Sequence, residues 1–409
     1  MSTTTGISTD RLHAWEAHVK AAYLDPGLLP HALTVVYRRG ELVHQHAQGY
    51  ADVEASRALR DTDIFRIYSM TKPVTSLAFM MLLEEGRVTL NDPVSSVIPG
   101  WANLGVWAQE EGGVITTEPP ARPMRMIDLL RHTSGLSYHI QQGGRVDALY
   151  RERGIGSATD LAGFIDALAD VPLEHHPGEA WHYSAATDVL GYVVERLSGQ
   201  PFENFVRTRI LEPLGMTDTD FSVPPDKAAR FMPCYVLTGR GRTLFDPAHG
   251  SRYLAAPRFV SGGGGLVSTA ADYLRFCRML LRGGELDGAR IVGPKTLELM
   301  TRNHLPGGAD VASLARSPIA VSASASRGVG FGLGFAVTLD PVRAQRLGNA
   351  GDFSWGGAAG TYFWIDPVED LAVIFMTQQL MSPERVQDDL RTFVYSALTD
   401  SPTRPHTLA

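Results

Sequence analysis

The stretch Ser69–Pro73, which reads Ser-Met-Thr-Lys-Pro, decides how the rest of the sequence is interpreted. It follows a β-like segment at 64–68 and opens a helix that ends near Gly86. Serine and lysine three residues apart in a helix are separated by roughly 4.5 Å along its axis, so their side chains share one face. A neutral amine beside a hydroxyl can take its proton and activate a weak nucleophile. The spacing therefore favours Ser69 as a nucleophile with Lys72 as its base.

The position of Ser69 at a helix N-terminus supports this hypothesis. The positive end of the helix dipole faces it, and its own backbone N–H can point at a developing oxyanion. Pro73 fits the first turn, where the backbone N–H has no acceptor within the helix. The alternative is structural: Ser-x-x-Lys occurs by chance, with Ser69 as a plain N-cap and Lys72 as a solvated side chain. Further motifs elsewhere in the sequence are needed to distinguish the catalytic role of Ser69 and Lys72 from this structural role.

The composition is that of a soluble globular protein. The 409 residues are 44% hydrophobic and 20% charged, which excludes a disordered chain, a collagen or a coiled-coil rod. Lys and Arg total 37 against 44 Asp and Glu, so there is no basic excess for nucleic acid or anionic lipid. We expect no nucleic-acid partner and no membrane partner. The length allows two or three lobes, or one catalytic domain with an insertion.

The cysteines and the apolar runs indicate a compartment. Cys234 and Cys277 are too few for a disulfide framework, so free buried thiols are expected, with a single bridge as the alternative. The first residues lack the pattern of a signal peptide. The longest apolar run, 77–83, is far shorter than the ~20 residues that span a bilayer. We expect a cytoplasmic protein.

Hydrophobic periodicity predicts strands at both ends of the chain and helices between them. The expected helices cover about 8–23, 70–85, 186–198 and 383–398, with another opening near 270; the expected strands cover 32–37, 41–46, 334–339, 360–365 and 371–377. Residues 88–183 are divided into short helical pieces by Pro, Gly and Asn-Asp signals. One sheet built from both termini, with a helical insertion, follows from this order.

Other catalytic signatures are absent from the sequence. It contains no Gly-x-Ser-x-Gly, no His-Glu-x-x-His and no Walker loop. The glycines at 262–265 and 328–334 lack a dinucleotide-binding setting and are expected in loops or close strand approaches. His44 and His46 could share a strand face, but no further Asp or His cluster accompanies them. We therefore expect no metal and no cofactor.

Four motifs occur in order and carry a family resemblance. They are Ser69–Pro73, Asp128–Leu136, Pro177-Gly178 with Tyr183-Ser184, and Trp355–Gly360. Together they resemble the serine hydrolases of the class C β-lactamase and D-alanyl-D-alanine carboxypeptidase type, and most of all the family VIII carboxylesterases. The resemblance extends over about residues 10–400.

The resemblance implies an α+β fold of the β-lactamase/transpeptidase-like type. An antiparallel sheet would be flanked by N- and C-terminal helices, with an all-helical lobe inserted. The expected boundaries place residues 1–86 and 184–409 in the sheet domain and 87–183 in the helical lobe, with the active site at their seam. The loop around Tyr138–Gly144 is expected to form part of the pocket wall. The sequence leaves the oligomeric state open.

The resemblance also implies roles for individual residues. Ser69 matches the acylated nucleophile, and Lys72 and Tyr183 match its proton-transfer partners. Either partner can take the first proton, and we expect the pair to titrate as a unit. The backbone N–H groups of Ser69 and Ala358 match the oxyanion hole. The remaining matched positions are substrate-binding: Trp355, Gly356 and Gly357.

Two departures from the family pattern concern the substrate. Ala185 stands where the tyrosine element has Asn, which removes an amide that would orient an acylamino group. Trp355 stands where a lysine would pair with a substrate carboxylate, so an anchor for anionic penicillins and D-Ala peptides is missing. An aromatic side chain there suits neutral esters.

The sequence therefore predicts a serine carboxylesterase that hydrolyses short-chain neutral esters through an acyl-enzyme on Ser69. A first alternative keeps the scaffold and changes the chemistry to that of a β-lactamase, a D-amino-acid peptidase or an acyltransferase. A second alternative is an inactive binding or sensor module. The presence of Ser69, Lys72 and Tyr183 together argues against it.

Overall fold

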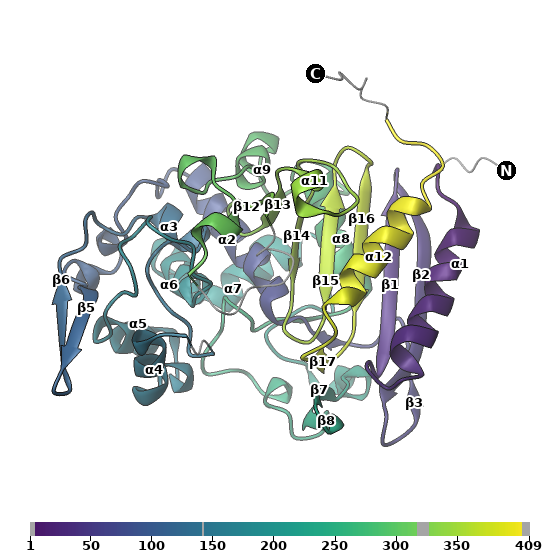
Figure 1. Cartoon of the computed structure of the whole chain (residues 1–409), viewed down its shortest axis with the longest axis horizontal. Helices are drawn as coiled ribbons and strands as arrows, with labels where there is room; N and C mark the ends of the chain where they lie inside the picture. Colours follow the sequence, from purple (N-terminus) through teal and green to yellow (C-terminus); the bar gives the residue numbers. More distant parts are fainter. Residues whose placement is uncertain (1–4, 141–142, 317–326, 403–409) are drawn as a thin grey trace.

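The computed structural model describes residues 5–140, 143–316 and 327–402. At its centre lies an antiparallel sheet of eight strands in the order β12-β13-β14-β15-β16-β1-β2-β3 (Figure 1). Their bounds are β1 His31–Arg38, β2 Glu41–Asp52, β3 Arg57–Ala58, β12 Val329–Phe331, β13 Ala336–Thr338, β14 Phe353–Gly356, β15 Tyr362–Asp366 and β16 Leu371–Met376. Strands from both ends of the chain meet where β1 pairs with β16, as the sequence predicted.

The central strands are buried on both faces, which explains their nearly continuous apolar sequences. In the β1–β16 register, Val35 lies opposite Ile374 and Val36 opposite Val373. Because successive side chains point to opposite faces, the first pair joins the larger hydrophobic core on one face of the sheet. The second pair joins a separate core under the terminal helices.

Helices cover the two faces of the sheet in separate layers. The terminal helices α1 (Thr9–Val19) and α12 (Arg385–Ser396) pack side by side on one face (Figure 1). Helix α8 (Ala270–Leu281) packs against β15 and β16 on the other face. The α+β architecture therefore consists of a sheet between two helical layers.

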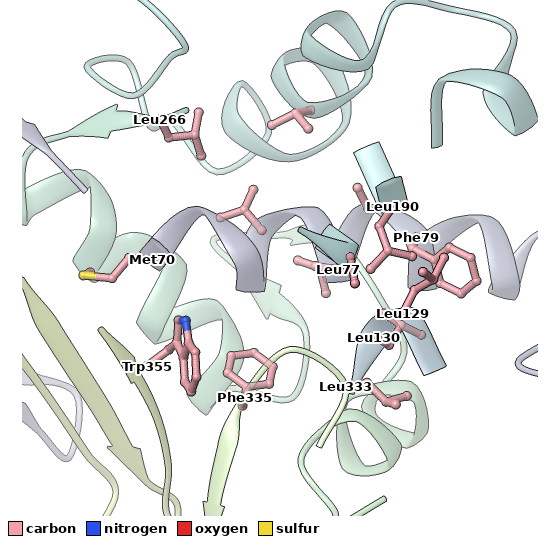
Figure 2. Close-up of a cluster of buried hydrophobic side chains, with 14 of the residues drawn as sticks. Met70, Leu77, Phe79, Leu129, Leu130, Leu190, Leu266, Leu333, Phe335 and Trp355 are labelled. Carbon is pink, nitrogen blue, oxygen red and sulfur yellow. The ribbon is translucent and has the colours of Figure 1, made fainter. Parts of the chain in front are cut away.

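Helix α2 (Thr71–Glu84) is buried around its whole circumference from Thr71 to Leu82. Figure 2 shows Met70 at its start and, among the side chains packed around the helix, Trp355, Phe335 and Leu190. A helix that is apolar nearly all round is enclosed by neighbours on every side.

The segment 87–183 and the residues after it supply a cluster of short helices. They are α3 (Met126–Leu130), α4 (Arg145–Glu152), α5 (Leu161–Ala169), α6 (Ala186–Ser198) and α7 (Phe202–Val206). Helix α6 packs against α3, α5 and α7 and also against α2, and so joins this cluster to α2. The predicted boundary at residue 183 stays a prediction.

The expectation of an all-helical lobe was wrong in one place. Strands β5 (Val106–Glu111) and β6 (Val114–Glu118) form a hairpin that projects from the lobe (Figure 1). Its turn is Gly112-Gly113, and both residues have positive φ, at 58° and 82°. Most of its side chains are exposed, so neither strand shows the alternation by which a half-buried strand is recognised.

Smaller elements complete the chain. They are β4 (Phe65–Arg66) paired with β9 (Val267–Ser268), β7 (Cys234–Thr238), β8 (Gly241–Asp246) and β17 (Gln379–Leu380) in one sheet, β10 (Glu285–Leu286) paired with β11 (Ala289–Arg290), α9 (Pro294–Met300), α10 (Val311–Leu314) and α11 (Pro341–Ala344). Cys234 and Cys277 are free and buried, as predicted. Within the described residues, no helix is both long and apolar enough to cross a bilayer.

The enclosure of α2 makes its apolar residues important for stability. Leu77→Ala should lower the free energy of unfolding by about 2–5 kcal/mol, because Leu77 is fully buried and its removal leaves a cavity. Leu42→Ala is the matched control, since Leu42 is 52% exposed, and its effect should stay within about 0.5 kcal/mol. Urea denaturation measures both. Equal effects of the two substitutions would contradict this description of the core.

Candidate active site

The three residues predicted to move protons meet at one atom, the hydroxyl oxygen of Ser69. Lys72 Nζ lies 3.2 Å from Ser69 Oγ. The hydroxyl of Tyr183 donates to the same oxygen at 2.7 Å. Ser69 is half-buried, whereas Lys72 and Tyr183 are 2% and 5% exposed. Ser69 is thus the more accessible of the three residues, and both of its partners are buried.

A strained turn presents Ser69. Residues Tyr68–Met70 form one turn of 3-10 helix directly before α2, so Ser69 precedes the α-helix and is not its first residue. Tyr68 has a φ of 42°, which a bulky side chain rarely adopts. Backbone strain of this kind is held in place by the surrounding structure and is concentrated at functional sites.

Tyr183 is positioned by pairing between two segments that are distant in sequence. The N–H of His182 donates to the carbonyl of His132 at 2.9 Å, and the N–H of Ala185 donates to the carbonyl of Ser137 at 3.0 Å. His132 adopts a φ of 56°, in the left-handed region. These backbone bonds fix Tyr183, which precedes α6, against the segment that carries the second sequence motif.

His132 lies directly behind Tyr183, and the sequence did not single it out as a site residue. The two ring centroids are 4.9 Å apart, and His132 Nδ1 lies 3.2 Å from the hydroxyl of Ser184. Burial, with contributions from the charges of Lys72 and His182, holds the pKa of His132 well below its ordinary value. His132 is therefore a neutral, buried ring that packs against Tyr183.

The glycine run 262–265 supplies a second partner for Lys72. The Nζ atom donates to the carbonyl oxygen of Gly263 at 2.7 Å. The neighbouring Gly262 carbonyl accepts from Thr75 Oγ1 on α2, also at 2.7 Å. The prediction that these glycines form a loop or a close approach is confirmed. The run itself was the sequence signal, but nothing in it identified a carbonyl as the functional group.

Tyr138 forms part of the wall beside the nucleophile, in the loop where the sequence placed it. Its ring centroid is 5.8 Å from that of Tyr183 and 5.4 Å from Lys72 Nζ. Burial and then the charge of Asp188 raise the pKa of Tyr138 well above its ordinary value, which keeps its hydroxyl protonated. Residues 141 and 142 of the predicted wall lie outside the described residues.

The end of β14 lies against the turn that carries Ser69. A Cβ atom at Gly357 would lie 2.3 Å from the carbonyl oxygen of Ile67, so this close approach requires glycine. A turn from Gly357 to Gly360 follows, closed by the Gly360 N–H, while the Gly357 N–H donates to Thr361. Neither of these bonds uses the N–H of Ala358, which lies at the exposed tip of the turn.

Trp355 lies deeper than a pocket wall exposed to solvent. It is 2% exposed, and its ring packs 5.7 Å from Tyr183 and 5.2 Å from Phe331, measured between centroids. The structure therefore places Trp355 behind Tyr183, whereas Gly356 and Gly357 are half-buried. The substrate-binding role of these three residues stays a prediction.

The His44 and His46 pair lies far from this site along β2. Both rings approach Glu16 Oε1, at 3.7 Å and 3.6 Å. Among the residues that the structure describes, no group of three or more His, Cys, Asp or Glu side chains is arranged to hold a metal ion.

An acidic pair, buried Asp147 and half-buried Glu174, lies beneath the loop that carries Tyr138. Asp147, on α4, accepts from the N–H groups of Gly143 and Gly144 at 2.8 Å each and from the hydroxyl of Ser137. Glu174 lies beside it. Burial and then the negative charge of Asp147 raise the pKa of Glu174 to about 7.

Glu174 should make stability depend on pH. Because its pKa is higher in the folded protein than in the unfolded chain, stability falls as pH rises from about 4.5 to about 7. Glu174→Gln mimics the protonated carboxyl, so its free energy of unfolding should exceed that of wild type increasingly over this range and level off above it. Glu179→Gln, at an exposed neighbour, is the control and should change the free energy of unfolding by no more than about 0.5 kcal/mol. A constant offset for Glu174→Gln, measured by urea denaturation at several pH values, would contradict the prediction.

Comparison with known proteins identifies the family. The model of the β-lactamase family matches residues 21–396. The protein Rv1367c of Mycobacterium tuberculosis is 38% identical over 357 residues, which cover 87% of each chain. The esterase EstB of Burkholderia gladioli is 33% identical over 370 residues, which cover 85% of each chain.

The fold matches a solved structure over nearly its whole length. The structure of EstCE1, described as a hydrolase with promiscuous acyltransferase activity, superposes with a TM-score of 0.78 at 26% identity and covers 95% of this chain and 98% of its own. The predicted resemblance and the β-lactamase/transpeptidase-like α+β fold are confirmed. The chain belongs to the β-lactamase family and is a serine hydrolase.

Proposed function

We propose that this protein is a carboxylesterase that hydrolyses short-chain neutral esters through an acyl-enzyme on Ser69. The observation that carries the proposal is the shared contact of Lys72 and Tyr183 with Ser69 Oγ. A hydroxyl held between a basic side chain and a phenol has a partner to take its proton and another to return one.

The reaction proceeds in two balanced halves. Ser69 Oγ bonds to the ester carbonyl carbon as its proton passes to the Lys72–Tyr183 pair. The bond from the carbonyl carbon to the alkoxy oxygen then breaks, and the departing alcohol takes that proton. Water next attacks the acyl-enzyme, the carboxylic acid leaves, and Ser69 regains its proton. The amides of Ser69 and Ala358 would stabilise the oxyanion in both halves.

The surroundings of Tyr183 favour a neutral substrate with a small acyl group. The rings that pack against it belong to His132, Tyr138, Trp181 and Trp355. His132 is neutral, and Trp355, at the position of the family's lysine, carries an uncharged indole ring. The ring of Tyr138, 5.4 Å from Lys72 Nζ, favours a small acyl group, and an apolar setting with few convergent polar groups suits uncharged esters.

The relatives point the same way. The similarity to EstB, named an esterase, favours ester hydrolysis and membership of the family VIII carboxylesterases. The similarity to EstCE1 favours acyl transfer to small alcohols as a second activity of the same acyl-enzyme. Two free thiols are typical of a reducing compartment, so we also propose a cytoplasmic location.

A series of p-nitrophenyl esters tests the substrate class. Turnover should be highest for acetate to butyrate and fall for longer acyl chains. It should be lower for an ester of the same length with a terminal carboxylate, and Ser69→Ala should abolish it.

Added methanol should divert part of the product to the methyl ester. Faster turnover of a chromogenic cephalosporin than of any ester would replace the proposal with a β-lactamase.

Tyr183→Phe tests the proton-transfer assignment. Loss of the hydroxyl 2.7 Å from Ser69 Oγ should lower kcat by about 10²–10⁴-fold and leave KM little changed. Tyr37→Phe is the matched control, because Tyr37 is equally buried and its hydroxyl has no hydrogen-bond partner within the described part of the chain. Wild-type kcat for Tyr183→Phe would remove the tyrosine from the mechanism.

A further inference from the structure

We propose that Asp188 is a positioning residue for proton transfer at Ser69. Its buried carboxylate holds the glycine loop so that the carbonyl of Gly263 orients the Lys72 amine. The inference rests on the proposed function only in taking Ser69 as the nucleophile and the Lys72–Tyr183 pair as its proton acceptor.

A chain of short contacts joins the carboxylate to the lysine. Asp188 Oδ1 accepts from the Gly263 N–H at 2.9 Å and from the hydroxyl of Ser261 at 2.6 Å. The carbonyl of the same glycine accepts from Lys72 Nζ at 2.7 Å. Asp188 is 3% exposed and Lys72 is 2% exposed, so water does not compete strongly for either end. The glycine is therefore held on its N–H side and presents its C=O to the lysine.

The packing around the loop leaves it little freedom. A Cβ atom at Gly263 would lie 2.6 Å from Asp188 Oδ2, and one at Gly262 would lie 2.7 Å from the carbonyl oxygen of Thr187. On its other side the loop is tied to α2 by the bond from Thr75 to Gly262. The loop is thus clamped between the catalytic helix and the first turn of α6.

This clamp affects the direction of the lysine's lone pair. A neutral amine that donates one N–H to a fixed carbonyl can adopt fewer orientations. Those in which its lone pair points at Ser69 Oγ therefore become favoured. Ala185 has no polar side chain with which to share this role. The Gly263 carbonyl therefore acts as the orienting group, and Asp188 acts through it.

The charge of Asp188 contributes separately. Asp188 is the third residue of α6, where the helix dipole stabilises a carboxylate. The Lys72–Tyr183 pair gains a positive charge when it takes the proton of Ser69. The buried negative charge of Asp188, which is separated from Lys72 by Gly263, favours the protonated Lys72–Tyr183 pair. Removal of this charge should therefore make the pair lose its proton more easily.

The test measures phosphonylation of Ser69 by a fluorophosphonate at several pH values, with intact-mass detection. In this step the Ser69 oxygen bonds to phosphorus, fluoride leaves and the serine proton passes to the pair. Asp188→Asn keeps the shape and an acceptor oxygen of the side chain but removes its charge. The acidic limb of the pH profile of the phosphonylation rate should therefore move to lower pH. Asp188→Ala should in addition lower the maximal kinact by about tenfold, with the reagent's KI unchanged.

Asp272→Asn is the matched control. Asp272 is also a buried third residue of a helix, α8, and accepts from the N–H of Asp218 and the hydroxyl of Thr219. It should leave both kinact and the pH profile unchanged. The proposal is overturned if Asp188→Asn retains the wild-type pH profile, if Asp188→Ala retains the wild-type maximal kinact, or if Asp272→Asn changes either quantity equally.

The measurement separates this inference from the proposed function, because labelling needs no ester substrate. If wild type labels at Ser69 but hydrolyses no ester, the carboxylesterase proposal fails and the role of Asp188 is still decided by the variants. Near-UV circular dichroism verifies that each variant is folded. Asp188→Asn, nearly isosteric with the native residue, decides the question if Asp188→Ala does not fold.

Discussion

The enclosure of helix α2 is the constraint on which the active site depends. Because this helix has buried neighbours on every side over three turns, neither Lys72 nor the turn before it can shift without disturbing the core. Helices α6 and α7 supply part of the enclosure, and Trp355 and Phe335 pack beside the helix as well (Figure 2). Ser69, at the end of this fixed helix, therefore has a defined place relative to Tyr183 and to the β14 edge.

Burial of a lysine is costly unless its polar atoms have partners. Here the partners are Ser69 Oγ and the Gly263 carbonyl, and aromatic rings complete the surroundings of the amine. The glycine loop thereby resolves two requirements at once. It satisfies a buried donor without adding a second ionised side chain in direct contact, and it holds the amine beside Ser69.

The sequence predicted what depends on local spacing. Ser69 and Lys72 are one helical turn apart, and the alternating strands at both ends of the chain have the period of a sheet. Tyr183 was predicted only through the family resemblance, because no local rule relates it to Ser69. The Gly263 carbonyl could not be predicted, since a backbone group has no residue type to mark it.

The errors have physical causes as well. The β5–β6 hairpin has solvent on both faces, so its sequence shows no alternation, and only the Gly112-Gly113 pair marks it. His132 adopts a left-handed backbone conformation through its pairing with the segment around Tyr183. That pairing joins residues about fifty positions apart, and a local pattern does not report it.

The sheet that joins the two ends of the chain also has a consequence for biosynthesis. A nascent chain that has emerged only as far as β12 already contains the nucleophile, the lysine and the tyrosine. It lacks β16, the partner of β1, and the turn that carries Ala358. Until β16 has been translated, one edge of the apolar strand β1 therefore has no partner. A chain with such an open strand edge is prone to aggregation. The surroundings of the Ser69 turn are complete only when β14–β16 have docked against β1 and against this turn.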